Sequence, residues 1–344
     1  MFVDISKTFK FQKIEIIMKK TMILMVILTT WLVSAMMCQF DRVYASHHLY
    51  ADESITMISK NPAVIHGMDA FVYTFDVDCH GIPTRQVTVN AFKQSDSKGA
   101  VVLTTGGTGG NFYSARSGEA LETVRLLFRD GYEVYEVRWD GEMGWGTNAR
   151  GRGFHVAVGG FTELVRYMFH HLFDNNDKVI AHGNSGGAFQ IAYGLAIYDL
   201  DEVLDMVILT GGPPTSDLKA GIFGHEDFPE RWRAGAGGRR LTDYMMGWDG
   251  EGDYCAKGEA PDHIKNQLDT VSLVTDLQPR RYHYNTFVNF VQSDDPTKAH
   301  DQARIYYEVI TSGKSYYYLP EVTSHNVPGS LEGARIIRQL IMDF

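Results

Sequence analysis

Residues 183–187 read Gly-Asn-Ser-Gly-Gly, so Ser185 has a glycine two positions before it and two positions after it. The apolar run 178–182 precedes this pattern and an amphipathic run follows it, which predicts a strand-to-helix turn around the serine. Such a turn is tight and presents its hydroxyl group at a helix N-terminus, where free N–H groups stabilise a developing anion. We therefore predict that Ser185 is a nucleophile; the alternative is that it only caps the helix.

A glycine-rich segment, 104–110, follows another predicted strand and reads Thr-Thr-Gly-Gly-Thr-Gly-Gly. It does not fit the dinucleotide-binding pattern G-x-G-x-x-G, because the register that starts at Gly107 ends on Phe112. Backbone N–H groups without bulky side chains can approach a reacting carbonyl group closely. We expect Gly107 or Thr108, together with Gly186, to form an oxyanion hole; the alternative is a flexible turn.

A serine nucleophile needs a general base and a carboxylate that orients the base. Among the histidines, His325 alone lies between the last predicted strand and the last predicted helix, so we predict that it is the base. The preceding strand is followed by two consecutive carboxylates. We favour Asp295 as the acid over Asp294, and Asp217, which follows an earlier strand, is a more distant alternative.

Short β-branched and aromatic runs alternate with amphipathic runs from residue 71 onward. Two or three hairpin strands followed by strand–helix alternation predict an α/β fold with a mostly parallel central sheet and helices on both faces. The predicted strands are 71–77, 86–94, 100–105, 133–139, 178–182, 205–210, 286–292 and 315–319. The predicted helices are 116–130, 155–173, 185–199, 298–312 and 329–343. Residues 212–285 break the alternation and are interpreted as an inserted cap.

The first 45 residues are interpreted as a targeting segment and residues 46–344 as the folded domain. The charge-free apolar run 21–37 follows two lysines, and small residues suit cleavage after Ala35 or Ala45. This is typical of a secretory signal peptide, so we expect a secreted or periplasmic protein. The alternative is an uncleaved membrane anchor. Translation starts at Met1 or at Met18.

Composition excludes several classes of function. The net charge is −10, with 32 basic and 42 acidic residues, which repels a polyanion, so we expect no nucleic-acid partner. We expect no metal, because no metal-binding motif such as H-E-x-x-H occurs. Cys79 and Cys255 are the only cysteines beyond the N-terminal segment, and the sequence leaves open whether they form a disulfide or stay unpaired.

The strand–Gly-x-Ser-x-Gly–helix pattern, the glycine-rich loop and the order Ser185, Asp295, His325 together resemble the α/β-hydrolase family over residues 65–344. The resemblance implies that the serine attacks an acyl carbon, that the histidine transfers the proton and that the aspartate orients the imidazole. Two positions depart from the common family pattern. Asn184 precedes the nucleophile and Thr105 precedes the first loop glycine, where many members have histidine.

Within that family we expect a secreted carboxylic-ester hydrolase that needs no cofactor and acts on a small-molecule ester or acyl substrate. The alternatives are a serine peptidase or acyltransferase with the same triad, and a binding protein without catalysis. The cap resembles the segment that shapes the substrate pocket in this family. Its aromatic residues Trp232 and Trp248 are therefore candidate pocket residues, unless they only pack the cap onto the sheet.

Overall fold

The structure is a computed structural model that describes residues 55–79, 82–147, 149–175, 177–224, 234–250, 252–275 and 280–344. The predicted signal peptide or anchor and Trp232 lie outside these residues. Of the helices in the described ranges, none has the length and apolar character needed to cross a membrane. The location of the protein therefore stays a prediction from the sequence.

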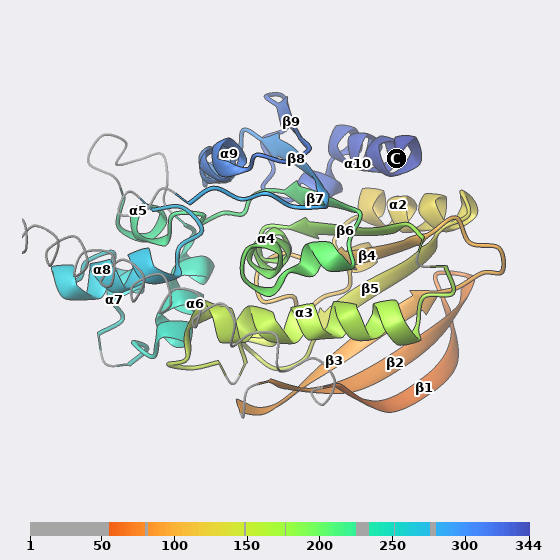
Figure 1. Ribbon diagram of the computed structural model, residues 1–344, viewed down its shortest axis with the longest axis horizontal. Coiled ribbons are helices and arrows are strands. Elements are labelled where there is room, and N and C mark those ends of the chain that lie inside the picture. Colours follow the sequence, from red (N-terminus) through yellow and green to blue (C-terminus); the bar gives the residue numbers. More distant parts are fainter. Residues whose placement is uncertain are drawn as a thin grey trace, which may run out of the picture. The chain divides into compact units, whose positions relative to one another are not determined.

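The described strands form one sheet (Figure 1). They are β1 (Ile55–Ile65), β2 (Met68–Cys79), β3 (Ile82–Phe92), β4 (Ala100–Thr104), β5 (Glu133–Trp139), β6 (Val179–Asn184), β7 (Met206–Thr210), β8 (Phe287–Ser293) and β9 (Lys314–Leu319). Their order across the sheet is β1-β2-β3-β5-β4-β6-β7-β8-β9. The pairs β1–β2, β2–β3 and β3–β5 are antiparallel. The pairs β5–β4, β4–β6, β6–β7, β7–β8 and β8–β9 are parallel.

Helices cover both faces of the sheet (Figure 1). The α-helices are α2 (Gly118–Arg129), α3 (Gly153–His171), α4 (Gly186–Tyr198), α5 (Leu218–Phe223), α6 (Ala236–Met246), α7 (Tyr254–Lys257), α8 (Asp262–Val271), α9 (Ala299–Val309) and α10 (Leu331–Asp343). Short 3-10 helices are η2 (Tyr113–Ala115), η3 (Gly144–Gly146), η4 (Leu200–Glu202) and η5 (Val327–Gly329). This layered α/β arrangement confirms the predicted fold class.

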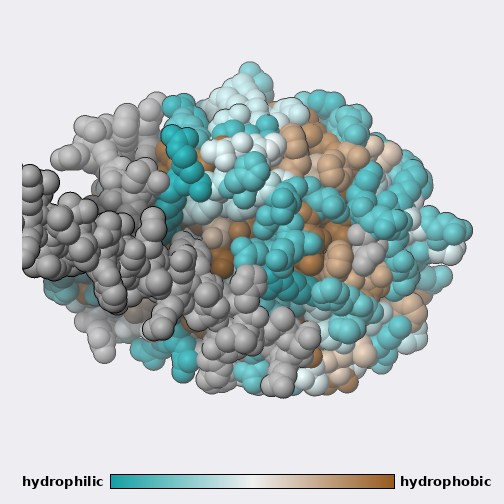
Figure 2. Space-filling view, viewed as in Figure 1, coloured by the Kyte–Doolittle hydropathy of each residue, from teal (hydrophilic) through white to brown (hydrophobic). Residues whose placement is uncertain are grey.

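The core consists of two apolar clusters, one on each face of the sheet. Side chains of a strand alternate between its faces, so in β4 Val101 and Leu103 join the cluster with α2 and α10, whereas Val102 joins the cluster with α3 and α4. All five residues of β4 are buried, as a central strand covered on both faces requires. Figure 2 shows hydrophilic residues interspersed with smaller hydrophobic patches on one face of the surface.

In the described part of the segment between β7 and β8, the helices α5 to α8 gather at one end of the sheet (Figure 1). This is the segment that the sequence analysis interpreted as a cap. Helix α6 packs against η3 so closely that a side chain at Gly146 would come within 2.5 Å of Met245 and 2.9 Å of Leu241. The segment between β7 and β8 is therefore tied to the loop that follows β5.

All eight predicted strands are present, but the sequence analysis missed β1. Most side chains of β1 are exposed, so the strand lacks the apolar alternation by which strands are recognised. Pro62 within it also argues against a strand by local criteria, although proline is tolerated at a sheet edge. Among the described strands, β1 occupies such an edge and pairs with β2 alone.

Candidate active site

Ser185 lies at the sharp turn between β6 and α4, with φ of 53° and ψ of −112°. A positive φ is rare for a residue with a side chain and is held here by a hydrogen bond from the Ser185 N–H to the Thr210 carbonyl oxygen, 2.8 Å long. A Cβ atom on Gly183 would lie 2.4 Å from the Gly187 carbonyl carbon, so the turn requires glycine there. The Ser185 side chain makes no capping hydrogen bond to α4, so the helix-cap alternative does not describe this structure.

The structure brings His325 to Ser185 although the two residues are 140 positions apart. His325 Nε2 lies 2.7 Å from Ser185 Oγ, which is hydrogen-bonding distance for a base and the hydroxyl group that it deprotonates. Ser185 is on the turn after β6, and His325 is on the loop that joins β9 to η5. The imidazole is partly accessible, with 31% of its side chain exposed.

On the other side of the imidazole, His325 Nδ1 lies 3.4 Å from Asp295 Oδ2. Asp295 follows β8 and is fully buried. Its Oδ2 atom has no hydrogen-bond partner among the residues that the structure describes, so this oxygen is available to the imidazole. Burial raises the pKa of Asp295, but the contact with the His325 imidazole and the hydrogen bonds from Thr297 outweigh this effect, and the pKa lies below its usual value.

The other two carboxylates that the sequence analysis considered have different partners. Asp294 is 40% exposed and forms an ion pair with Lys298, with 2.6 Å between Oδ1 and Nζ. Asp217 caps α5 by accepting a hydrogen bond from the Ala220 N–H at 2.8 Å. The structure thus brings Asp295 to His325 and places Asp294 and Asp217 in other interactions.

The glycine-rich loop after β4 lies directly against the serine turn. A Cβ atom on Gly106 would lie 3.1 Å from Ser185 Cβ, and one on Gly186 would lie 2.1 Å from the Gly107 oxygen. Among the described residues, the N–H groups of Gly107, Thr108 and Gly186 donate no hydrogen bond to a carbonyl group or side chain. The three N–H groups that the sequence analysis named thus have no acceptor among the described residues, and they belong to segments in contact with each other beside Ser185.

No family model and no curated protein sequence matches this chain. Solved structures do resemble it. An acetyl xylan esterase from a Thermoanaerobacterium species matches with 13% identity over 88% of this chain and 90% of its own, at a TM-score of 0.51. The chain has the α/β-hydrolase fold. Two further structures have lower TM-scores. Alpha/beta hydrolase domain-containing protein 10 from mouse is 11% identical over 83% of this chain and 97% of its own, at a TM-score of 0.46. A dienelactone hydrolase from Anabaena variabilis is 10% identical over 83% of this chain and 96% of its own, at a TM-score of 0.43.

Sequence analysis missed Thr297, which contacts both Asp295 and His325. Its backbone N–H donates to Asp295 Oδ1 at 2.8 Å, its hydroxyl group donates to the same oxygen, and its Oγ1 lies 3.3 Å from His325 Nδ1. The sequence Asp-Pro-Thr carries a usable signal, because an aspartate often accepts a hydrogen bond from the backbone two residues further on.

Thr210 at the end of β7 is a second residue that the sequence did not single out. Its carbonyl oxygen holds the Ser185 N–H, and its hydroxyl group donates to Asn184 Oδ1 at 2.9 Å. Through these two hydrogen bonds, Thr210 links the serine turn to the neighbouring strand β7. Asn184, one of its partners, stands where many members of this fold have histidine. His182 Nε2 also lies 3.2 Å from the Thr210 hydroxyl oxygen.

Of the two candidate pocket residues, Trp232 lies outside the described residues. Trp248 is 7% exposed and makes an edge-to-face contact with Tyr254, with 5.9 Å between ring centroids. Trp248 is thus packed within the segment between β7 and β8. Its role in a substrate pocket stays a prediction.

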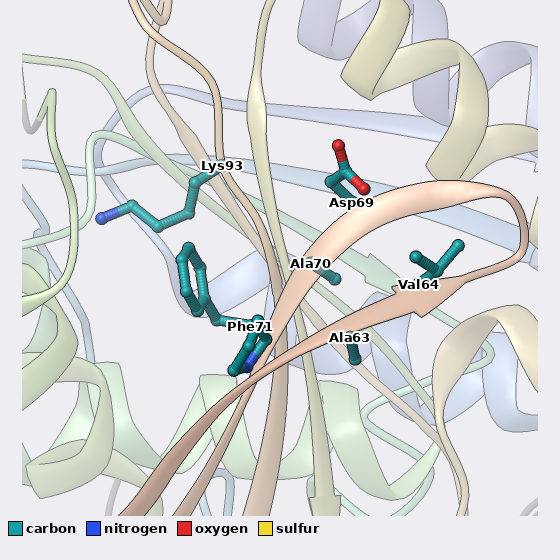
Figure 3. Close-up of a pocket in the computed structure, with 7 residues that line it drawn as sticks. Ala63, Val64, Asp69, Ala70, Phe71 and Lys93 are labelled. Atoms are coloured by element: carbon teal, nitrogen blue, oxygen red, sulfur yellow. The ribbon is translucent and has the colours of Figure 1, made fainter.

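A pocket of about 450 Å³ lies away from Ser185, at the hairpin of β1 and β2 (Figure 3). Its lining residues are Pro62, Ala63, Val64, Asp69, Ala70, Phe71 and Lys93. The Lys93 ammonium group already donates to Asp174 Oδ1 and to the Leu172 carbonyl oxygen, each at 2.7 Å. None of the predicted site residues lines this pocket.

Two further expectations concern metals and cysteines. Over the described ranges, no group of three or more His, Cys, Asp or Glu side chains is arranged to hold a metal ion. Cys255 in α7 is buried and has a free thiol, so the structure has no disulfide at this residue. Burial raises the pKa of the Cys255 thiol, and the nearby Asp243 carboxylate raises it further.

Proposed function

We propose that this protein is a serine hydrolase that cleaves carboxylic esters through an acyl-enzyme. The observation that carries the proposal is the 2.7 Å distance between His325 Nε2 and Ser185 Oγ. In the proposed reaction Ser185 Oγ attacks the ester carbonyl carbon while His325 accepts the hydroxyl proton. Asp295 keeps the imidazole in the orientation that presents Nε2 to the serine and stabilises the imidazolium that forms.

The negative charge that develops on the carbonyl oxygen is assigned to backbone N–H groups. The N–H of Gly186 and that of Gly107 or Thr108 are unoccupied by described residues and lie on segments in contact beside Ser185, which supports this role. Protonated His325 then gives its proton to the leaving alcohol, and the acyl group stays on Ser185. A water molecule, deprotonated by His325, releases the carboxylic acid and restores the enzyme.

The preference for an ester substrate is the finer part of the proposal. It is supported by the likeness in fold to a protein whose name describes it as an acetyl xylan esterase. The rival activities are peptide-bond hydrolysis and acyl transfer, since both can use the same three side chains. A binding protein without catalysis is a weaker rival, because it gives no reason for a serine held in strained backbone beside a histidine.

A fluorophosphonate probe tests the nucleophile directly. We expect the probe to label Ser185 in the folded protein and to label neither the Ser185→Ala variant nor the heat-unfolded wild type. Ser185→Ala should lower ester hydrolysis by about 10⁴- to 10⁶-fold, as the removal of a triad serine does elsewhere. Activity of Ser185→Ala within tenfold of the wild type would reject the assignment.

The reaction class is tested with three sets of substrates on the same preparation. These are p-nitrophenyl esters of graded acyl length, aminoacyl anilides, and an ester in the presence of increasing alcohol. We expect hydrolysis of esters to exceed that of anilides and to yield free acid at every alcohol concentration. Faster anilide cleavage would indicate a peptidase, and a transferred ester as the main product would indicate an acyltransferase.

We further propose that the mature protein is exported, on the basis of the apolar run 21–37 behind two lysines. Expression with the complete N-terminal segment, followed by fractionation and N-terminal sequencing, tests this. A mature protein outside the cytoplasm that begins after Ala35 or Ala45 is the expected result. An intact chain in the membrane fraction would instead support the anchor.

A further inference from the structure

Trp145 in η3 makes two hydrogen bonds to the loop after β4. Its indole Nε1–H donates to the Gly107 carbonyl oxygen at 2.9 Å, and its backbone N–H donates to the Thr108 carbonyl oxygen at 3.0 Å. The side chain is 1% exposed. A single residue thus restrains two successive peptide groups of the loop that carries the proposed oxyanion donors.

The restraint acts on a tightly bent part of the loop that lies against the first residue of α4. Gly107 adopts a positive φ of 64°, and its carbonyl oxygen lies so near Gly186 that a Cβ atom there would come within 2.1 Å. Since a peptide group is planar, holding the Gly107 carbonyl oxygen also fixes the direction of the Thr108 N–H. The Gly107 oxygen is therefore held between the indole N–H and the first residue of α4.

The indole ring also touches the helix that follows the nucleophile. Its centroid lies 5.6 Å from that of Phe189 in α4. Trp145 thereby contacts both sides of the proposed oxyanion hole, the glycine-rich loop by hydrogen bonds and the nucleophile helix by packing. A packing contact alone would not require an N–H donor at this position.

We propose that Trp145 is a positioning residue that holds the oxyanion-binding N–H groups in place through its indole N–H. The inference rests on the proposed function, because an oxyanion forms only if Ser185 attacks a carbonyl group. Donors that are fixed before the reaction stabilise the transition state without reorganisation, so losing the restraint should weaken transition-state binding more than substrate binding.

Trp139 in β5 offers a matched control. Its side chain is likewise 1% exposed, and it touches the same loop, since a Cβ atom on Gly109 would lie 2.8 Å from Trp139 Cδ1. Its indole N–H, however, has no hydrogen-bond partner within the described part of the chain. Trp139→Phe therefore removes comparable ring volume beside the loop without removing a hydrogen bond to it.

The test compares Trp145→Phe with Trp139→Phe in ester hydrolysis and in inhibition by an alkyl boronic acid, which forms a tetrahedral adduct with a serine nucleophile. For Trp145→Phe we expect kcat to fall and the inhibition constant to rise by about 10- to 100-fold each, with KM within about threefold of the wild type. This range is at or below the effect of deleting an oxyanion donor. For Trp139→Phe we expect kcat within about threefold, while both variants melt earlier.

A second substitution separates the hydrogen bond from packing if Trp145→Phe does not fold. Incorporation of 3-benzothienylalanine at position 145 replaces the indole N–H by sulfur and keeps the bicyclic shape. The expected result is the same loss of kcat with a smaller fall in melting temperature than Trp145→Phe shows, and the same replacement at position 139 should leave kcat intact.

Equal losses at the two positions, or a wild-type kcat with benzothienylalanine at position 145, would overturn the inference. The proposed function is judged separately by Ser185. If the probe does not label Ser185 and Ser185→Ala keeps its activity, the proposed function fails. If Ser185 is labelled and essential but the two tryptophan positions behave alike, only the role of Trp145 fails.

Discussion

Thr297 holds one oxygen of the Asp295 carboxylate with two hydrogen bonds, one from its backbone N–H at 2.8 Å and one from its hydroxyl group. The other oxygen, Oδ2, is left for His325. Because both bonds go to Oδ1, they fix the rotation of the carboxylate as well as its position. The arrangement suggests that the orientation of the imidazole depends on a threonine that does not itself react.

We predict that Thr297→Val lowers kcat by about tenfold or more without changing KM. Valine keeps the shape and the backbone hydrogen bond but removes the hydroxyl donor, and a hydrogen bond to a charged group contributes about 1.5–3 kcal/mol. Thr297→Ser should restore most of the lost kcat, since it retains the donor. Equal activity of the valine and serine variants would show that the hydroxyl group does not orient the acid.

The two adjacent carboxylates should differ sharply in their effects. Asp295→Asn is expected to lower kcat by about 10⁴-fold, because an amide can stabilise the wrong imidazole tautomer. Asp294→Asn weakens an exposed ion pair with Lys298 and the contact with Tyr318, neither of which involves His325, so its kcat should stay within about fivefold of the wild type. Steady-state kinetics on one ester checks both variants, and the reverse ranking would assign the acid to Asp294.

The buried His182 is expected to make folding stability sensitive to acid. Burial lowers its pKa from 6.5 to about 3, so above pH 6.5 it is neutral in both states. As the pH falls from 6.5 toward 3, the unfolded chain binds a proton that the folded protein does not, and stability is lost by up to about 1.4 kcal/mol per pH unit.

His182→Gln should therefore show a shallower loss of unfolding free energy between pH 6.5 and 4.5 than the wild type, measured by urea denaturation at each pH. Glutamine keeps a polar group near the Thr210 hydroxyl group but does not titrate. His263→Gln, at an exposed position of α8, serves as the control and should keep the wild-type slope. A parallel slope for His182→Gln would mean that His182 is not the group responsible.

Trp248→Ala is expected to destabilise the protein by about 3–5 kcal/mol, the usual cost of truncating a buried tryptophan. The reason is its 7% exposure and its edge-to-face contact with Tyr254. We expect the ranking of kcat/KM among short and long esters to stay as in the wild type. A shift in that ranking by about 1 kcal/mol or more would instead place Trp248 in the substrate pocket.

The amino-acid sequence by itself predicted most of the strands and helices of the sheet and the order Ser185, Asp295, His325 of the candidate catalytic residues along the chain. The strands from β2 to β9 and the helices α2, α3, α4, α9 and α10 were predicted from β-branched and aromatic runs that alternate with amphipathic runs. The turn at Ser185 could also be predicted from the sequence, because it depends on neighbouring residues. Gly183 and Gly187 approach each other within a few residues, so the requirement for glycine is visible in the sequence.

Contacts between distant segments were decided only by the tertiary structure. The sequence ranked Asp295 over Asp294 but could not separate them by geometry, because neighbouring side chains on a loop point in directions that depend on what packs around them. The same is true of Trp145, whose indole N–H meets Gly107 across 38 positions of sequence. β1 is present although its own residues do not predict it, because the backbone of β2 supplies its hydrogen-bond partners.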